Sequence, residues 1–362
     1  MTVVQASAPG KLFLLGEYAV LDGAPALLTA VDRRVSVSIT DSPDALWHLR
    51  TPGLGDDEIV LDERGGLPAG ADAASQERVR VFDAVVKAVS GAAPFDGLRE
   101  RALSVSIDSS AFFARENALN KLGLGSSAAV ATALTAALLA AEGSEPDPER
   151  VRVLATEAHR AAQGGTGSGG DVAASSYGGL ISYTRDTAPT ALSWPEELTI
   201  MVVVTGTGSS TTELVAAVAD YARRDEPQYR ADITRLASLA QQSEGALRSP
   251  HAFLDLADDY FDALDLLDQH AQAGIVSDLH RRLHSLAAGF GAVFKTSGAG
   301  GGDVGLAFVP TGKAVDKLGA AFAQAGAQAV PLAFGARGVA VTLGAAPDDG
   351  HKNTESGSVT VP

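Results

Sequence analysis

Hydrophobic and polar residues alternate along the first part of the chain. Residues 35–40 and 103–107 carry an apolar side chain at every second position, a period typical of strands with one buried face. Turn-forming residues, for example in 41–45, separate these segments. The first part of the chain is therefore predicted to form a sheet.

A long helix is predicted within the same part. Residues 127–141 are rich in alanine and leucine and contain no glycine or proline, whereas Gly143 and Pro146 follow shortly afterwards. This pattern favours a helix that stops near Gly143. It starts at the end of a glycine-rich segment, GLGSSA.

The pattern changes near residue 190. After a loop-like segment, 187–195, the strand-like LTIMVVV leads into long helical patterns. We predict helices over residues 211–223, 229–247 and 252–288, then strands over 304–309 and 338–343 with a helix over 313–325 between them.

Length and composition fit two folded domains. The 362 residues are 46% hydrophobic and 20% charged, enough to bury a substantial core. We predict one domain over residues 1–190 and another over 191–345. The polar, aperiodic residues 346–362 are expected to form a flexible tail.

Charge and cysteine content exclude several functions. The chain has no cysteine, which rules out disulfides, thiolate zinc sites and cysteine nucleophiles. Its net charge of -16 argues against a general surface for nucleic acid, which requires a basic footprint. An anionic small molecule would need a local basic pocket.

No membrane or export signal is recognised. The N-terminus shows no signal-peptide pattern, and the most apolar stretch, residues 128–141, is shorter than the roughly 20 residues that span a bilayer. We therefore expect a cytoplasmic protein that binds no nucleic acid or membrane. It is expected to act on a small molecule as a monomer or homodimer.

Glycine is concentrated in three segments, residues 120–129, 164–174 and 295–305. In the first, Gly123 and Gly125 let the backbone approach a ligand, and a helix starts at once. Free backbone N–H groups and the positive end of the helix dipole then face an anion, so we interpret the segment as a phosphate cradle. The alternative is an ordinary capped helix after a tight turn.

Two familiar phosphate-binding motifs fit less well. The P-loop requires lysine after its glycines, whereas Lys121 precedes them. The dinucleotide fingerprint is matched formally by GLGSSA and GTGSGG, but it belongs between an apolar strand and its helix. The run before Gly123, ARENALNK, is polar.

The three loops, with the N-terminal PGKL and GEY segments, resemble the motifs of the GHMP kinases in kind and order. Within that superfamily the details are most like phosphomevalonate kinases. Tyr18 stands where mevalonate kinases and galactokinases usually have histidine, and KLGLGSS and SGAGGGD have the form typical of that family. Arg160 stands near the usual place of the metal-binding glutamate of mevalonate kinases.

The resemblance implies a fold and a reaction. The fold would be α+β, with an N-terminal mixed α/β nucleotide-binding domain, a C-terminal ferredoxin-like α+β domain, and the active site in a cleft between them. The reaction would transfer the γ-phosphoryl group of ATP, with Mg²⁺, to the phosphate of 5-phosphomevalonate. Such transfer depends mainly on positioning and charge neutralisation.

The resemblance also implies roles for individual residues. Lys121 and Asp171 would be catalytic, with Lys121 holding the acceptor and the transferring group; Asp171 could instead cap a helix. The nucleotide would be bound by Gly123, Leu124, Gly125, Ser126, Ser127 and Ala128, with Ser127 the better candidate for the metal. The substrate would be bound by Lys11, Glu17, Tyr18, Ser168, Gly169, Ser210, Thr211, Gly298, Ala299 and Gly300.

Several alternatives remain open. Glu17 could fix the orientation of Lys11 or help to hold the site. The hydroxyl groups of Ser168, Ser210 and Thr211 could have structural roles instead of binding the substrate. His159 is interpreted as a surface or core residue. At the level of function, the alternatives are mevalonate kinase, with Asp171 as a true base, diphosphomevalonate decarboxylase, and a metabolite sensor without catalysis.

Overall fold

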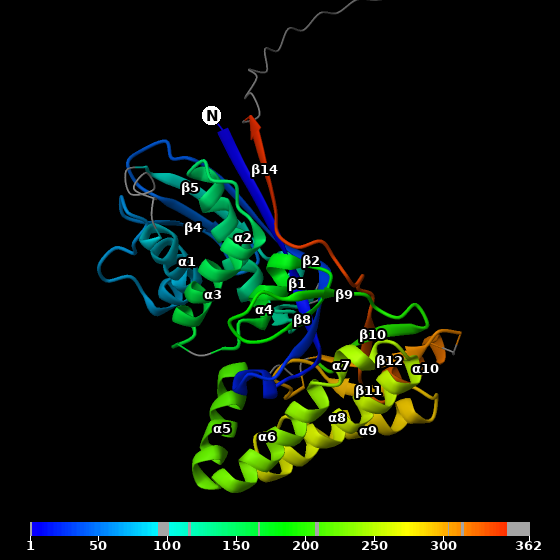
Figure 1. Ribbon diagram of the computed structural model, residues 1–362. Helices are drawn as coiled ribbons and strands as arrows, with labels where there is room; N and C mark the ends of the chain where they lie inside the picture. Colours follow the sequence, from blue (N-terminus) through cyan, green and yellow to red (C-terminus); the bar gives the residue numbers. More distant parts are fainter. Residues whose placement is uncertain are drawn as a thin grey trace, which may run out of the picture.

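The protein has two lobes, which a computed structural model describes for residues 2–92, 101–114, 117–165, 167–206, 210–302, 304–312 and 315–345. In Figure 1 the first lobe holds the long strands β1 and β2, and the second holds the helices α5 to α9 with a small sheet beside them. Strand β1 runs from the N-terminus toward the second lobe, so its C-terminal end lies near the contact between the lobes.

The first lobe is a sheet covered by helices. Its elements in chain order are β1 (Thr2–Leu15), the 3-10 turn η1 (Ala19–Asp22), β2 (Ala26–Asp41), β3 (His48–Thr51), β4 (Gly55–Val60), α1 (Ala73–Gly91), β5 (Leu103–Asp108), the 3-10 turn η3 (Ser110–Phe112), β6 (Phe113–Ala114), β7 (Asn117–Lys121), α2 (Ser126–Ala141), α3 (Pro148–Ala162), α4 (Gly170–Tyr177), β8 (Leu180–Tyr183) and β9 (Thr190–Leu192).

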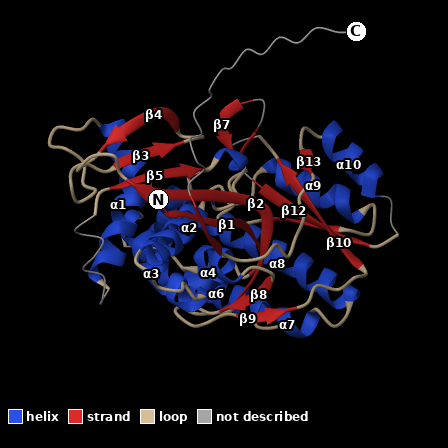
Figure 2. Cartoon of the chain, turned by 90° about the horizontal axis from the view of Figure 1, so that it is seen from above, coloured by secondary structure: helices blue, strands red, loops and turns tan. Residues whose placement is uncertain are grey.

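The main sheet has the order β14-β1-β2-β5-β3-β4, with β8 beside β2 and β9 beside β8. Neighbouring strands are antiparallel except β3 and β5. Seen from above in Figure 2, the helices α1 to α4 lie together on one side of this sheet. Helix α2 is buried nearly all round, as expected of a helix that is apolar on every face.

The second lobe confirms the ferredoxin-like expectation. Its small sheet has the antiparallel order β11-β12-β10-β13, so the first strand in sequence lies beside the third and the fourth. Its elements are β10 (Leu198–Val204), α5 (Thr211–Arg224), α6 (Glu226–Ala240), α7 (Ser243–Ala246), α8 (Pro250–Ala271), α9 (Asp278–Ala288), β11 (Val293–Thr296), β12 (Val304–Pro310), α10 (Val315–Gln324) and β13 (Gln328–Val330).

Two predicted helices are interrupted. The pattern over 229–247 corresponds to α6 and the short α7, and the pattern over 252–288 corresponds to α8 and α9. Helix α8 stops at Gln272, which adopts a left-handed conformation, and Ser277 caps the start of α9. Apolar periodicity continues through the break, which explains why the pattern hid it.

The last described strand, β14 (Ala340–Ala345), pairs with β1 in the first lobe. The prediction of a strand over 338–343 is therefore confirmed, but the strand belongs to the other sheet, because β13 already occupies the edge next to β10. The division of the chain near residue 190 stays a prediction. The predicted tail, 346–362, lies outside the described residues.

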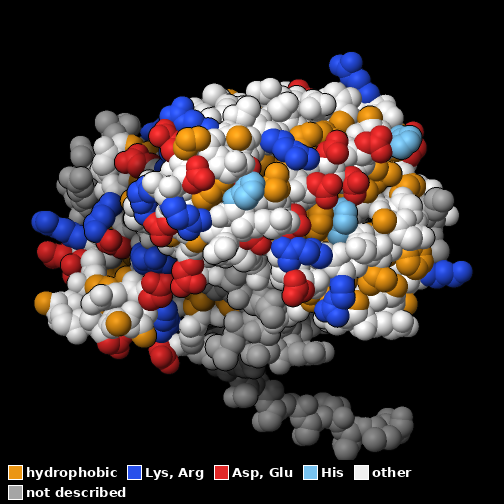
Figure 3. All heavy atoms as spheres, turned by 90° about the horizontal axis from the view of Figure 1, so that it is seen from below, with side chains coloured by type: hydrophobic (Ala, Val, Ile, Leu, Met, Phe, Trp, Pro, Cys, Tyr) orange, Lys and Arg blue, Asp and Glu red, His pale blue; other side chains and the backbone are white. Residues whose placement is uncertain are grey.

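The surface fits the acidic composition. On the face seen in Figure 3, acidic and basic side chains are interspersed, and no continuous basic patch is visible. Among the described residues, no helix combines the length and the apolar character needed to cross a bilayer.

Candidate active site

Lys11 joins the three glycine-rich segments. Its backbone N–H donates to the carbonyl of Leu124 at 2.9 Å, and its Nζ lies 3.5 Å from Oδ2 of Asp171. Its stem runs along Gly125, where a Cβ atom would lie 2.8 Å from Lys11 Cε. A Cβ at Gly298 would be 3.8 Å from Lys11 Nζ. The structure thus brings the first motif (PGKL and GEY), the second motif (GLGSSA) and the third motif (SGAGGGD) to one lysine.

The loop before α2 is shaped by its glycines. Gly125 precedes the first residue of the helix with a φ of 77°, a conformation that side chains disfavour. Leu124 and Ala128 are buried, so these two residues can offer a nucleotide only their backbone. Together with Gly123 and Ser126 they frame the N-terminus of α2, where backbone N–H groups favour an anion.

The hydroxyl of Ser127 points toward α3. Its Oγ lies 3.0 Å from Nε2 of His159, and the amide nitrogen of Gln163 lies 3.2 Å from the same imidazole nitrogen. Burial lowers the pKa of His159, whereas the carboxylate of Asp171 raises it in part. The interpretation of His159 as a mere surface or core residue is incomplete, because it contacts a predicted metal ligand.

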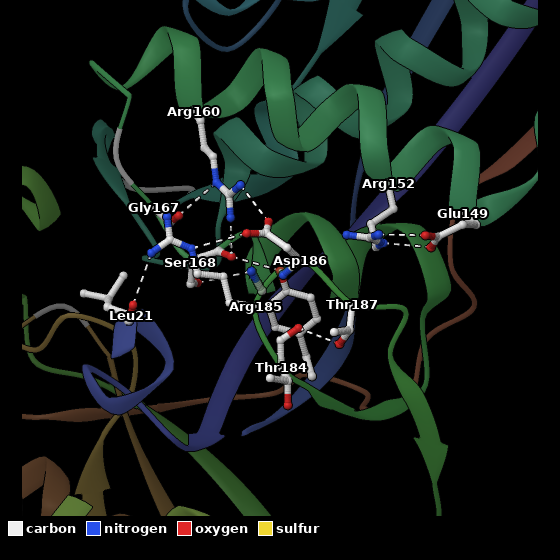
Figure 4. A network of polar contacts seen from close by, with 12 residues as sticks. Leu21, Glu149, Arg152, Arg160, Gly167, Ser168, Thr184, Arg185, Asp186 and Thr187 are labelled. Atoms are coloured by element: carbon white, nitrogen blue, oxygen red, sulfur yellow. Dashed lines mark hydrogen bonds and ion pairs between the residues drawn. The ribbon is translucent and has the colours of Figure 1, made fainter. Parts of the chain in front are cut away.

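Arg160 holds the second glycine-rich segment in place. Its guanidinium donates to the carbonyls of Gly167 and Ser168 at 3.0 and 2.9 Å and pairs with Asp186 at 2.7 Å, as Figure 4 shows. The hydroxyl of Tyr183 donates to the Ser168 carbonyl as well, at 2.9 Å. These bonds fix the loop that precedes α4.

The start of α4 presents Asp171 to the site. Gly169 precedes the helix in a left-handed conformation, and a Cβ there would lie 2.8 Å from the hydroxyl of Tyr183. The Ser168 hydroxyl accepts a hydrogen bond from the N–H of Gly170 at 3.2 Å. Ser168 therefore has a local structural bond, while Asp171, in the first turn, keeps 30% of its side chain exposed.

The third motif is fastened to the first by side chains. Ser297 donates to the carbonyl of Phe13 at 2.8 Å and accepts from its N–H at 3.1 Å. The hydroxyl of Tyr18 donates to the carbonyl of Ala299 at 2.6 Å. Burial, then the charges of Asp268 and Glu17, raise the pKa of Tyr18, so its hydroxyl remains a donor.

Beneath the third motif lies a turn that Asp268 organises. Its carboxylate accepts the N–H groups of Gly274, Ile275 and Val276 at 2.7, 2.8 and 3.0 Å. The carbonyl of Ile275 would lie 2.4 Å from a Cβ at Gly300. Only glycine fits this close approach. The packing of the protein therefore explains Gly300 even if it contacts no ligand.

Glu17 lies behind the loops. It is 3% exposed, and its Oε1 is 2.5 Å from Nζ of Lys295, which is 0% exposed. Lys295 also donates to the carbonyl of Thr296, and Tyr260 donates to the Glu17 backbone carbonyl at 2.9 Å. Besides substrate binding, two roles were considered for Glu17. Its pairing with Lys295 fits a residue that supports the site, and does not fit one that orients Lys11.

Other predicted residues are less closely tied to the site. Ser210 and Thr211 are exposed at the start of α5, where the Ser210 hydroxyl accepts the N–H of Glu213 at 3.3 Å. Ser210 therefore caps α5, and its substrate-binding role stays a prediction. The backbone of Lys121 belongs to β7, but its side chain lies outside the described part.

Sequence reasoning assigned no role to the side chains of Lys295, Ser297 and Asp268. A signal was present for the first, because Lys295 directly follows the apolar run AVF just before the third motif, and Glu17 interrupts LLGEYAV. Two opposite charges, each beside or inside an apolar segment, are consistent with a buried pair. No comparable signal marks Asp268, which lies in an acidic helix.

A divalent metal fits this site only together with a phosphate ligand. In the described ranges, no three or more histidine, aspartate or glutamate side chains cluster as a metal site. Mg²⁺ is usually held by one or two protein oxygens plus substrate phosphates. The Ser127 hydroxyl and the Asp171 carboxylate are oxygens of that kind, so the residues present are compatible with a nucleotide-bound metal.

The comparisons with known proteins agree with this geometry. Residues 84–179 match the family described as GHMP kinases N terminal domain. A phosphomevalonate kinase of Streptomyces is 31% identical over 83% of this chain and 88% of its own length, and a mevalonate kinase of Thermococcus sibiricus is 31% identical over 59% and 61%. A Streptococcus pneumoniae phosphomevalonate kinase, solved with phosphomevalonate and AMPPNP, superposes with a TM-score of 0.73 at 20% identity, covering 91% of this chain and 99% of that one.

The fold and the loops therefore define a phosphotransferase of the small-molecule kinase class. The chain belongs to the GHMP kinase family, and it is an ATP-dependent phosphotransferase. Its relatives include kinases for mevalonate and for phosphomevalonate, so the family alone leaves the acceptor open.

Proposed function

We propose that the protein is a phosphomevalonate kinase, which transfers the γ-phosphoryl group of ATP to 5-phosphomevalonate and releases 5-diphosphomevalonate and ADP. One observation carries the proposal: the N-terminal ends of two helices, α2 and α4, meet at Lys11. Each end favours an anion. A site with a lysine between two such ends suits a reaction between two anionic phosphates.

The roles of the residues follow from their placement. The backbone around Gly125 binds the phosphates of ATP, and Lys11 lies between the donor and the acceptor. Lys121, at the end of β7, neutralises the transferring group; Lys121→Ala is expected to lower turnover by orders of magnitude in a folded protein. A metal supplied with ATP would be held by the Ser127 hydroxyl and the Asp171 carboxylate, where it would offset phosphate charge.

In the reaction, a terminal oxygen of the acceptor phosphate bonds to the γ-phosphorus, and the bond from that phosphorus to the bridging oxygen of ADP breaks. The acceptor is already mostly ionised near pH 7 if it behaves like a protein phosphate, whose second pKa is about 6. No strong base is then required. Lys11, paired with Asp171, reduces the repulsion between the two anions.

Mevalonate kinase is the second candidate, because the similarity to the Thermococcus enzyme is also substantial. It would need Asp171 to remove a hydroxyl proton. Two features favour the phosphate acceptor: the longer similarity to the Streptomyces enzyme and the cation of Arg160, which binds the carbonyls of Gly167 and Ser168 where mevalonate kinases usually have a metal-binding carboxylate.

The direct test offers the purified protein Mg-ATP with mevalonate, 5-phosphomevalonate or homoserine, in separate reactions, and follows ADP release with a coupled assay. Turnover with 5-phosphomevalonate alone supports the proposal. Turnover with mevalonate alone would retain the ATP site and overturn the acceptor. No turnover with any acceptor, and no binding of ATP, would favour a metabolite sensor.

A further inference from the structure

Two side chains, one from α2 and one from the residue that caps the end of α3, face the same imidazole nitrogen of His159 on α3. The Ser127 hydroxyl and the Gln163 amide nitrogen lie 3.0 and 3.2 Å from Nε2 of His159. His159 is 7% exposed, and Gln163 follows it by one helical turn. The three residues thus form a small, partly buried polar group beside the phosphate-binding loop.

The direction of each hydrogen bond in this group follows from the donors available. An amide nitrogen can only donate, so the nitrogen that it faces must accept. We therefore assign His159 the tautomer with its proton on Nδ1, in which Nε2 has one lone pair with which to accept. The Ser127 hydroxyl, at the shorter of the two distances, donates to that lone pair, and the Gln163 amide shares it.

This assignment decides what else the Ser127 hydroxyl can do. A hydroxyl has one hydrogen and two lone pairs, and the hydrogen is engaged by His159. Only lone pairs remain for a ligand on the loop side. Ser127 is thus unsuited to donate to a phosphate oxygen and suited to bind a cation.

We propose that His159, supported by Gln163, is a positioning residue that commits the Ser127 hydroxyl to the divalent metal of the bound nucleotide. The inference rests on the proposed function insofar as it needs a metal–ATP complex, but it does not depend on the acceptor. It selects Ser127 over Ser126 as the metal ligand. Partners behind a metal ligand typically contribute about 10–100-fold to metal affinity.

The test measures Mn²⁺ binding to the complex of the protein with AMPPNP, by electron paramagnetic resonance, beside the binding of metal-free AMPPNP in EDTA. His159→Phe removes the acceptor and fills the space. We expect Mn²⁺ affinity to fall about 10-fold, while metal-free AMPPNP binds within about twofold of wild type. His159→Gln, whose carbonyl oxygen can accept the same hydrogen, should restore most of the metal affinity.

A double-mutant cycle separates this role from a general disturbance of α3. In a Ser127→Ala background, His159→Phe should have no further effect on Mn²⁺ affinity, because the hydroxyl that it orients is gone. Thr156→Val, a nearly isosteric change one turn earlier on the same helix, is the matched control and should leave Mn²⁺ affinity unchanged.

The outcomes are distinct. Unchanged Mn²⁺ affinity in His159→Phe, or an equal loss with and without Ser127, would overturn the inference and leave the proposed function intact. Parallel losses of Mn²⁺ and metal-free AMPPNP would assign His159 to the loop's shape instead. A wild-type protein that binds no AMPPNP would overturn both the inference and the proposed function.

Discussion

Two lysine–carboxylate pairs each include one residue of the first motif, and they differ in distance and in exposure. Lys11 and Asp171 are 3.5 Å apart, with 7% and 30% of their side chains exposed. Lys295 and Glu17 are 2.5 Å apart, with 0% and 2% exposed. The first pair joins the glycine-rich loops, and the second lies behind them, where the two lobes meet.

The difference indicates what each pair can do. Lys11 is in looser contact with a carboxylate that water also reaches, so a phosphate can replace or join that carboxylate at low cost. Lys295 has no such freedom, because separating it from Glu17 would leave two charges in a dry interior. We infer that the open pair, Lys11 and Asp171, contacts ligands. The sealed pair, Lys295 and Glu17, holds the third motif in place.

The largest effect should come from breaking the sealed pair. Lys295→Met leaves Glu17 buried without its cation, which typically costs about 3–5 kcal/mol. We expect a matching loss in the free energy of unfolding, measured by urea denaturation. The double variant Glu17→Gln with Lys295→Met should regain most of it. If Lys295→Met were as stable as the wild type, the pair would not stabilise the fold.

Removing the open cation should affect activity instead of stability. Lys11→Met keeps the packing against Gly125 and leaves Asp171 partly solvated, so the stability change should stay below about 1 kcal/mol. Loss of a preorganised charge at the reacting phosphates should lower kcat/KM about 10²–10³-fold. Steady-state kinetics and urea denaturation of the same preparation check both parts. If Lys11→Met lost as much stability as Lys295→Met, the two pairs would not differ in their roles.

A smaller effect is expected for the partner carboxylate. With a phosphate acceptor, Asp171→Asn removes the charge that orients Lys11 but keeps an oxygen for the proposed metal, so it should lower kcat about 10-fold, less than the 10²–10⁴-fold that loss of a general base can cost. Its pH–rate profile should keep the shape of the wild-type profile. A fall of 10³-fold or more with loss of a pH limb would instead support a hydroxyl acceptor.

The smallest effect expected is a loss of stability at mildly acidic pH, because a buried side chain without an opposite charge resists becoming charged. His280 on α9 is buried, and burial, aided by Arg281, lowers its pKa to about 4. Because the unfolded chain binds a proton near pH 6.5, the folded state loses stability as pH falls from there toward 4. Linkage gives about 0.7 kcal/mol between pH 7 and pH 6.

Urea denaturation at pH 7 and pH 6 tests this prediction, with His280→Gln as the reference. The wild type should lose more stability than the variant over that interval. Equal losses would mean that His280 does not titrate differently in the folded and unfolded protein.

Much of the fold was accessible from the pattern of residues. The buried helix α2, the strands β5, β10 and β12, and the helix α5 lie where periodicity predicted them. The break between α8 and α9 was missed because apolar spacing continues across it. The place of β14 was missed because alternation predicts a strand but not its partner.

The candidate site shows the same division. The glycine-rich segments and the residues near them, Lys11, Asp171 and Ser127, stood out in the sequence because loops that approach a phosphate need glycine and because hydroxyls and charges beside them are conspicuous. His159 and Asp268 did not stand out, since their importance comes from contacts with residues far away in the chain.

By itself, the sequence determined the phosphate-binding segments and many of the strands and helices, because these depend on local composition and spacing. The class of reaction and the α+β fold followed from the resemblance of its motifs to those of a known family. Only the tertiary structure decided that Lys11 pairs with Asp171, that Glu17 is sealed against Lys295, and that Ser127 faces His159. The physical reason is that a charge or a hydroxyl acquires its role from its burial and its partner, and both are set by the packing of distant segments.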